Sequence, residues 1–269
     1  MQYRLLLSLT IGLLCLGAQN RNALASSEVS PTTAPSTQPA AYSIRGTVAV
    51  EQSWALQKPD LSRVAVYLAS DPALDTGTVP VVVSMEQYRK AFDPDFLVVP
   101  RGSKVEFPNS DHFYHNVFSR SRIAPPFDLD RFGYQFSKDR TFNTPGVIHV
   151  FCNIHPQMHG MIIVTPNSIF ARAGADGSFR LPPVPAGHYT LVAWYERSGE
   201  IREEIDVTET AASDQLNILL KENRQSVLAN VPPDHGSAYG IERGLGIKRE
   251  RLDLPVVTEI HPAPQGDRH

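Results

Sequence analysis

Residues 151–160, FCNIHPQMHG, bring together side chains that can bind a soft metal ion. Cys152, His155 and Met158 are separated by steps of three residues, a spacing that suits a tight loop between two strands. Thiolate and thioether are soft ligands and imidazole is borderline, so one cysteine, two histidines and a weak methionine form the ligand set of electron-transfer copper sites. The loop supplies three of these four ligands, and the fourth must come from elsewhere in the chain.

An upstream segment, VEFPNSDHFYHNVFS (105–119), offers two further histidines, His112 and His115. On a strand from about residue 113 to 118, alternate side chains share a face, so His115 is expected on the inward side with Phe113 and Val117. His112 falls in the preceding turn and is expected in solvent. His115 is therefore the candidate for the fourth ligand.

Other interpretations of these residues are open. Zinc binds Cys, His and carboxylate ligands, and Asp111 would complete such a site, although methionine is not among the usual zinc ligands. In a purely structural interpretation, Cys152 belongs to the core and the histidines cap strands. Met161 and His159 are alternative ligands, but Met161 is expected as a packing residue of the resumed strand, and His159 could bind only if the loop refolded.

The first 25 residues have the pattern of a cleaved secretory signal peptide: an early arginine, an apolar stretch over residues 5–18, and a small-x-small motif. The apolar stretch is shorter than the roughly 20 residues that span a bilayer, so no transmembrane segment is expected in the mature chain. Cys15 would leave with the signal. We therefore expect an exported protein, in the periplasm or outside the cell, whose single cysteine, Cys152, forms no internal disulfide.

Composition and pattern predict an all-β protein. The chain has 269 residues, 42% of them hydrophobic, and a net charge of -3 that argues against nucleic-acid binding. A flexible Ser/Thr/Pro linker is expected over residues 26–41, and a poorly ordered tail over residues 222–269. Between them, short alternating apolar runs bounded by Gly, Pro, Asn or Asp are typical of β-sandwiches. Residues 85–92, MEQYRKAF, are the best candidate for a short helix.

Residues 78–165 resemble the cupredoxins. VEFPNSDHFYHNVF is similar to the cupredoxin strand that carries the first histidine ligand, and FNTPGVIHVFCNIHPQM to the closing strand and ligand loop, with the CxxHxxM spacing of amicyanin and one residue fewer between His and Met than in plastocyanin. The resemblance implies a Greek-key β-sandwich with one copper ion that cycles between Cu(I) and Cu(II). It implies that the equatorial ligands are His115, Cys152 and His155 and that the axial ligand is Met158.

The same resemblance assigns roles to residues around the ligands. Asn116 is expected to tie the His115 strand to the ligand loop by hydrogen bonds. The edge of His155, framed by Ile154 and Pro156, is expected to be the port through which electrons pass.

A second resemblance concerns the flanks. Residues 174–196 are similar to the closing half of a carboxypeptidase regulatory-like module, a small Ig- or transthyretin-like β-sandwich, and residues 44–69 to its opening half. Asp176 and Gly177 predict a hairpin turn, after which Phe179, Leu181 and Val184 turn inward. The resemblance implies that residues 42–77 and 166–221 form one split module, with the cupredoxin of residues 78–165 inserted. Alternatively, residues 44–69 are the first strands of the cupredoxin itself.

These observations favour a blue, type 1 copper protein that carries single electrons to a redox protein partner. Two further hypotheses are open: a copper-binding and delivery protein, which extra Met and His residues such as His149 would suit, and a surface-binding module whose metal site is incidental. Because no side chain resembles a general base beside an open coordination position, the protein is not expected to be an enzyme.

Overall fold

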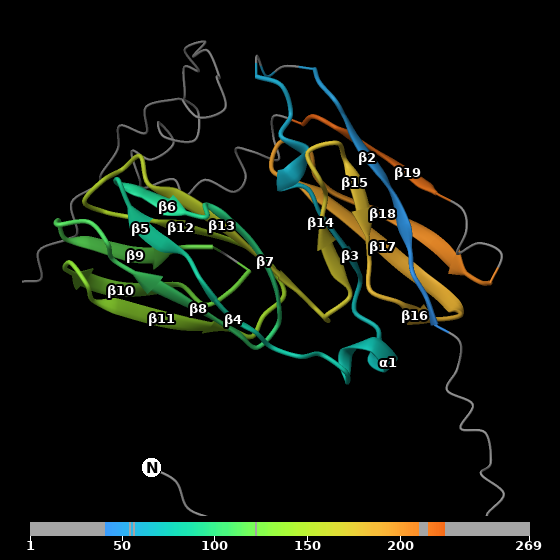
Figure 1. The fold of residues 1–269 in the computed structure, drawn as a ribbon, viewed down its shortest axis with the longest axis horizontal. Helices are drawn as coiled ribbons and strands as arrows, with labels where there is room; N and C mark the ends of the chain where they lie inside the picture. The colour runs from blue at the N-terminus through green and yellow to red at the C-terminus, as the bar shows by residue number, and fades with distance from the viewer. Residues whose placement is uncertain (1–40, 54, 56, 122, 210–214, 224–269) are drawn as a thin grey trace, which may run out of the picture. The chain divides into compact units, whose positions relative to one another are not determined.

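Short alternating apolar runs form β-strands throughout the part of the chain that the computed structural model describes, which comprises residues 41–53, 55, 57–121, 123–209 and 215–223 (Figure 1). Within these residues the helices are a 3-10 turn, η1 (Leu61–Arg63), and one short helix, α1 (Pro72–Asp75). The predicted all-β fold class is therefore confirmed. The described helices are too short to cross a membrane.

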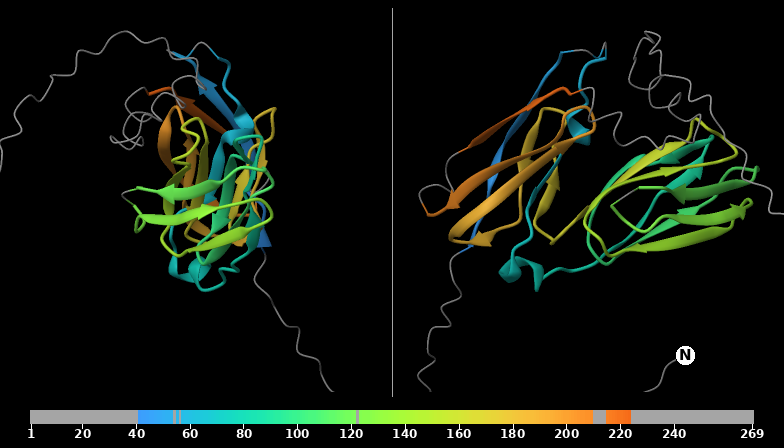
Figure 2. Two further views of the ribbon diagram at one scale, coloured as in Figure 1. Left: turned by 90° about the vertical axis from the view of Figure 1, so that its left-hand side faces the viewer. Right: turned by 180° about the vertical axis from the view of Figure 1, so that it is seen from behind.

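The strands between residues 82 and 165 form two main sheets and a hairpin. The five-stranded sheet has the order β10 (Phe127–Phe132), β9 (His115–Ser119), β12 (Gly146–Phe151), β13 (His159–Thr165), β7 (Phe96–Pro100). The three-stranded sheet has the order β11 (Ser137–Phe142), β8 (Ser103–Pro108), β4 (Val82–Ser84). The hairpin consists of β5 (Glu86–Tyr88) and β6 (Ala91–Asp93). Figure 2 shows the green and yellow-green strands of this region from two further sides, and β9, β12 and β13 are neighbours in the five-stranded sheet.

The two sheets enclose one apolar core, as in a β-sandwich. Side chains from both sheets meet in it, among them Val105 and Phe107 of β8, Val117 of β9, and Ile148 and Val150 of β12. Each fully buried aliphatic side chain contributes about 1.5–3 kcal/mol relative to an exposed one. This core also contains Cys152 and Met158, so the candidate ligands belong to it.

The predicted helix over residues 85–92 is wrong, because these residues form the β5–β6 hairpin. Its two-residue turn, Arg89 and Lys90, has φ angles of 53° and 58°, the left-handed conformation of a tight hairpin turn. Gln87 pairs with Phe92 across the hairpin, and both side chains are buried. The helical period in this stretch is too short to outweigh strand pairing and burial.

The remaining described strands form a second set of sheets. The four-stranded sheet has the order β14 (Phe170–Arg172), β3 (Ala65–Leu68), β17 (Gly187–Tyr195), β18 (Gly199–Val207). The three-stranded sheet has the order β15 (Ser178–Arg180), β2 (Arg45–Glu51), β19 (Leu216–Lys221). A small sheet joins β1 (Ala41–Tyr42) to β16 (Val184–Pro185). Strands that precede residue 78 thus pair with strands that follow residue 166.

Phe179, Leu181 and Val184 are buried in the core of this second set, as expected. The turn at Asp176 and Gly177 does not close a hairpin, however, because β14 and β15 belong to different sheets. The turn instead carries the chain from one sheet to the other, and Gly177 O accepts a hydrogen bond from Val48 N at 2.8 Å.

Several predicted segments lie outside the described residues: the signal peptide, nearly all of the linker, and the tail beyond residue 223. Glu222 and Asn223, assigned to the tail, continue from β19 instead. The Glu222 carboxylate accepts a hydrogen bond from Ser53 N at 2.9 Å, and Asn223 N donates to Arg197 O at 2.7 Å.

Replacing Gly177 by alanine is expected to destabilise the protein. Gly177 has a φ of +82°, and a Cβ there would overlap Val48 O. Left-handed backbone at a non-glycine residue costs about 1–3 kcal/mol, so the free energy of unfolding in urea should fall by at least that amount. Gly77→Ala is the matched control, because its Cβ would meet no atom closer than 3.7 Å. Equal stability of the two variants would contradict this account of the turn.

Candidate metal centre

Three side chains from two adjacent strands and the loop between β12 and β13 converge at one point. His115 is the first residue of β9, Cys152 directly follows β12, and His155 lies in the loop that leads to β13. One ligand atom from each lies within 4.8 Å of the others. Cys152 Sγ is 3.7 Å from His115 Nδ1, which is 3.1 Å from His155 Nδ1. Among the described residues no other group of three His, Cys, Asp or Glu residues gathers in this way.

The structure also separates the two methionines that follow His155. Met158 is 1% exposed and belongs to the same apolar core as Cys152, and its backbone N–H closes the loop by donating to His155 O at 2.9 Å. Met161 lies in a different apolar cluster, with Phe96 and Trp194. Met161 belongs to β13, where alternation places it on the face opposite Ile162 and Val164, whereas Met158 precedes the strand and is buried in the core with Cys152.

His159 shares the outer face with Met161 and binds another histidine. Its Nε2 lies 2.8 Å from His149 Nδ1, and its ring stacks on Phe151 with centroids 5.0 Å apart. Burial lowers the pKa of His149 to about 4, and burial, followed by the charges of His149 and Arg63, lowers the pKa of His159 well below its usual value. His149 and His159 therefore form a neutral pair on the face of the sheet that does not carry Cys152.

The ligand side chains influence one another's protonation. Burial raises the pKa of the Cys152 thiol, but hydrogen bonds with His115 and with the loop backbone outweigh it, and the pKa is lowered overall. Burial lowers the pKa of His115, but contacts with Cys152 and Asp111 raise it overall. The pKa of His155 is lowered by burial and by the charges of His115 and Lys90. The shifts of Cys152 and His155 favour a thiolate and a neutral imidazole, the forms that bind metal ions, whereas the shift of His115 favours its protonated form until a metal ion displaces the proton.

Asp111 contacts His115 on the side of the ring that faces away from Cys152. Its Oδ2 lies 2.9 Å from His115 Nε2, whereas the Nδ1 atom faces Cys152 and His155. Burial raises the pKa of Asp111, but hydrogen bonds from Lys90 N–H, His115 and Arg89 N–H lower it overall. The sequence suggested Asp111 only as a zinc ligand, and its contact with His115 was not predicted. Its spacing of four residues from His115 was the one available signal.

Asn116 joins β9 to the ligand loop. Its side-chain oxygen accepts a hydrogen bond from Asn153 N at 2.7 Å, and its amide group donates to Asp128 at 3.1 Å. The Asn116 side chain is buried, so the bond is partly shielded from water. It holds the backbone next to Cys152 against the strand that carries His115.

His155 is the ligand candidate nearest the surface. It is half-buried between the exposed residues Ile154 and Pro156. Phe113, expected beside His115 on the inward face, is 51% exposed and meets the His155 ring edge-on at 6.4 Å. The prediction for Phe113 is wrong because β9 begins only at His115, so the alternation of the strand does not extend back to residue 113. His112 is exposed, as predicted, and its ring contacts Tyr134.

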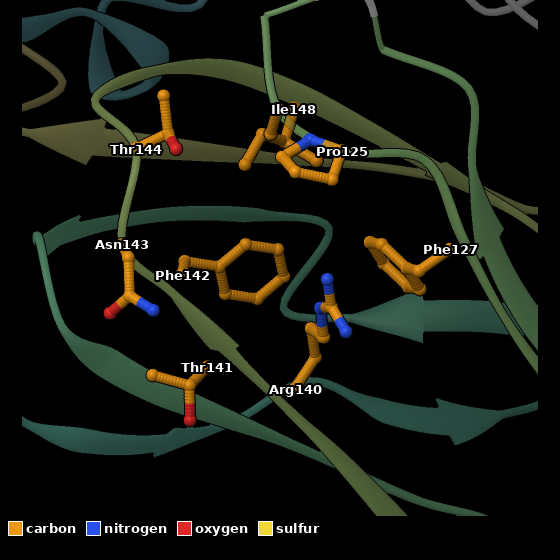
Figure 3. A pocket seen from close by; sticks show the side chains of 9 residues that line it. Pro125, Phe127, Arg140, Thr141, Phe142, Asn143, Thr144 and Ile148 are labelled. Carbon is orange, nitrogen blue, oxygen red and sulfur yellow. The ribbon is translucent and has the colours of Figure 1, made fainter.

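Hollows in the surface add no second metal centre to the described residues. An open, polar hollow beside Ile154 is lined by Tyr114, Asn116, Asp128, Asp130, Arg131 and Asn153. A smaller pocket of about 90 Å³ lies near the start of β12, at the other end of the strand from Cys152. Figure 3 shows the aromatic rings of Phe127 and Phe142 and the guanidinium of Arg140 around this pocket, whose lining contains no His, Cys, Asp or Glu.

Comparisons with known proteins find partial likenesses. No protein-family model and no curated protein matches the chain. Similar solved structures include a copper-containing nitrite reductase from Thermus scotoductus SA-01, at 30% identity and a TM-score of 0.30, over 32% of this chain and 22% of the reductase. An oxidized mutant of amicyanin matches at 19% identity and TM-score 0.30, over 31% of this chain and 81% of amicyanin. A purple cupredoxin from Nitrosopumilus maritimus matches at 24% identity and TM-score 0.26, over 29% of this chain and 84% of that protein.

These likenesses correct one prediction. The expectation that the protein is not an enzyme is withdrawn, because a nitrite reductase, which is an enzyme, is among the structures that resemble part of this chain. The reductase is matched over only about a fifth of its length. The resemblance of residues 174–196 to a regulatory-like module stays a prediction.

Replacing Asn116 by alanine is expected to loosen the ligand loop. A typical hydrogen bond contributes about 1 kcal/mol, so the amide proton of Asn153 should exchange with solvent about fivefold faster. Hydrogen exchange followed by NMR measures this rate. Asn143→Ala, which changes an exposed asparagine of the same sandwich, should leave the Asn153 amide unaffected. An unchanged exchange rate in Asn116→Ala would show that the hydrogen bond from Asn153 N–H to Asn116 does not hold the ligand loop.

Proposed function

We propose that the protein is an exported one-electron carrier that holds one copper ion with His115, Cys152, His155 and Met158. One observation carries the proposal: the sulfur of Cys152 and the Nδ1 atoms of two histidines converge at one point, in a sandwich whose core also contains Met158. A bound copper ion would supply a couple between Cu(I) and Cu(II).

The donor set supports copper rather than zinc. Structural zinc sites are closed by four Cys, His or carboxylate ligands. The nearby carboxylate, Asp111, lies against Nε2 of His115 and not on the Nδ1 side that faces Cys152. A buried thioether, Met158, shares the core with the thiol instead. Thiolate, two imidazoles and a thioether match the preference of copper in electron-transfer sites.

The surroundings of the ligands suit electron transfer. His115 is held by its strand and by Asp111, and Cys152 is held between β12 and the backbone tied by Asn116. Ligands fixed in this way rearrange little when the charge of a bound ion changes, which lowers the barrier to electron transfer. The half-buried His155 connects the buried thiol to the surface between Ile154 and Pro156. A redox protein partner would meet the site there.

Observations on the outer face give no support to the copper-delivery hypothesis. That hypothesis relied on exposed His149, His159 and Met161 as capture ligands. His149 and Met161 are buried, and His149 is bonded to His159. No observation on the described residues favours the surface-binding hypothesis.

We further propose that residues 78–165 form a domain inserted into a sandwich formed by residues 42–77 and 166–221. The pairing of β2 with β15 and β19, and of β3 with β14 and β17, supports this division. The pattern of the first 25 residues supports export to the periplasm or beyond.

The absorption spectrum tests the function. One equivalent of Cu(II) added to the mature protein should produce an intense thiolate-to-copper band, which ascorbate bleaches and reoxidation restores without loss of copper. The band should be absent in Cys152→Ser and His115→Ala. His112→Ala is the matched control, since His112 is exposed, and should keep the band. Copper held without such a band would contradict the electron-carrier proposal.

Two methionine variants test the axial ligand. Met158→Leu removes a thioether that shares the core with Cys152, whereas Met161→Leu removes one from the opposite face. Because a thioether donor stabilises Cu(II) more than Cu(I), the reduction potential should rise in Met158→Leu and stay near the wild-type value in Met161→Leu. Voltammetry of the two copper-loaded variants measures the difference. A rise confined to Met161→Leu would exchange the two assignments.

A further inference from the structure

The carboxylate of Asp111 is buried and surrounded by hydrogen-bond donors. The residue is 7% exposed. Its Oδ1 accepts a hydrogen bond from Arg89 N at 2.8 Å, and its Oδ2 accepts one from Lys90 N at 2.8 Å and faces His115 Nε2 at 2.9 Å. A carboxylate that accepts several hydrogen bonds in a buried place is held in one orientation.

The turn between β5 and β6 provides two of these bonds through its backbone. Arg89 and Lys90 both have left-handed φ angles, which direct successive N–H groups toward Asp111. Their side chains point elsewhere: the Arg89 guanidinium lies over the ring of Tyr88 at 5.1 Å, and Lys90 Nζ lies over Phe113 at 5.0 Å. The backbone, and not the two positive charges, therefore makes the hydrogen bonds to the carboxylate.

The backbone of Asp111 is fixed as well. Its N–H donates to Asn109 Oδ1 at 2.9 Å, and the Asn109 amide donates to Phe113 O at 2.8 Å and to Phe132 O at 3.0 Å. Asn109 is itself 1% exposed. The segment that leads into β9 is thus held at both its backbone and its side chain.

This arrangement has two consequences for His115. The carboxylate accepts a hydrogen bond from Nε2–H, so the ring hydrogen stays on Nε2 and the lone pair of Nδ1 is left facing Cys152 and His155. The carboxylate also places a negative charge one imidazole ring away from that lone pair. In a buried site of low dielectric constant, such a charge stabilises Cu(II) relative to Cu(I).

We propose that Asp111, held by the backbone of the Arg89–Lys90 turn, is a positioning residue that fixes the tautomer of His115 and lowers the reduction potential of the site. The inference rests on the proposed copper-binding function. It gives the β5–β6 hairpin a role in tuning a site to which it contributes no ligand.

Two substitutions separate the two effects. Asp111→Asn removes the charge but keeps an oxygen that can accept from Nε2–H. The Cu(II)/Cu(I) equilibrium should shift toward Cu(I) by about tenfold, equal to about 59 mV for one electron, while the Nε2 proton of His115 stays protected. Asp111→Ala removes both the negative charge and the acceptor oxygen. The potential should therefore rise, and the Nε2 proton, followed by NMR of the Cu(I) protein, should exchange with solvent at least tenfold faster.

Asp139→Asn is the matched control for charge, because Asp139 is an exposed carboxylate of the same sandwich, where solvent and salt screen it. If Asp111→Asn shifts the potential no more than this control, the effect on potential is refuted. If Asp111→Ala leaves the exchange of the Nε2 proton unchanged, the positioning role is refuted. Thermal unfolding checks that each variant folds, and Asp111→Asn still tests the charge if the alanine variant does not.

A double variant, Arg89→Asn with Lys90→Gly, tests the turn. Asn-Gly is favoured at left-handed turn positions and retains both N–H groups, so the Nε2 proton of His115 should stay protected. If the Nε2 proton exchanges as fast as in Asp111→Ala, the side chains of Arg89 and Lys90, and not their backbone N–H groups, keep Asp111 in place. If the wild-type protein does not form the thiolate-to-copper band, the proposed copper function is refuted. If the band forms but the Asp111 variants behave like the wild type, only the role of Asp111 is refuted.

Discussion

The pairing of β9 with β12 is the constraint on which the candidate metal centre depends. Phe118 lies opposite Phe151, and the antiparallel register continues to the hydrogen bond between Asn116 and Asn153. This register brings the start of one strand to the end of the other, which is where His115 and Cys152 stand. Because side chains alternate along a strand, a slip of one residue would turn His115 away from the thiol.

Burial strengthens the electrostatic interactions between the ligand side chains. The thiol and the imidazole of His115 lie in a core built by two sheets, where charged and polar groups interact more strongly than in water. The cost of burying them is offset by hydrogen bonds, of the imidazole with the buried Asp111 carboxylate and of the thiol with the backbone of Asn116 and of the ligand loop. His155 alone of the three reaches the surface, so the site is closed on one side and accessible on the other.

The sequence predicted strands correctly where an apolar run extended over a whole element. The strand before Cys152 and the strand after Met158 are apolar runs of six and seven residues that are buried along most of their length, and both form as expected. It failed where the pattern was short: MEQYRKAF forms a hairpin, and Phe113 lies outside the strand to which alternation assigned it. In both places the deciding factor is a contact made with a distant segment, as between Gln87 and Phe107 O at 3.4 Å.

The sequence by itself determined the chemistry of the site, because the types and spacing of Cys152, His155 and Met158 define a soft donor set in one loop before any folding is considered. It also determined the all-β class, because strand periodicity is a local property. The tertiary structure alone decided that the ring of His115 turns Nδ1 toward the thiol and Nε2 toward Asp111. It also decided that the Asp111 carboxylate meets the backbone of the Arg89–Lys90 turn, about 20 residues earlier in the chain, because only strand pairing and core packing can set the distance between such segments.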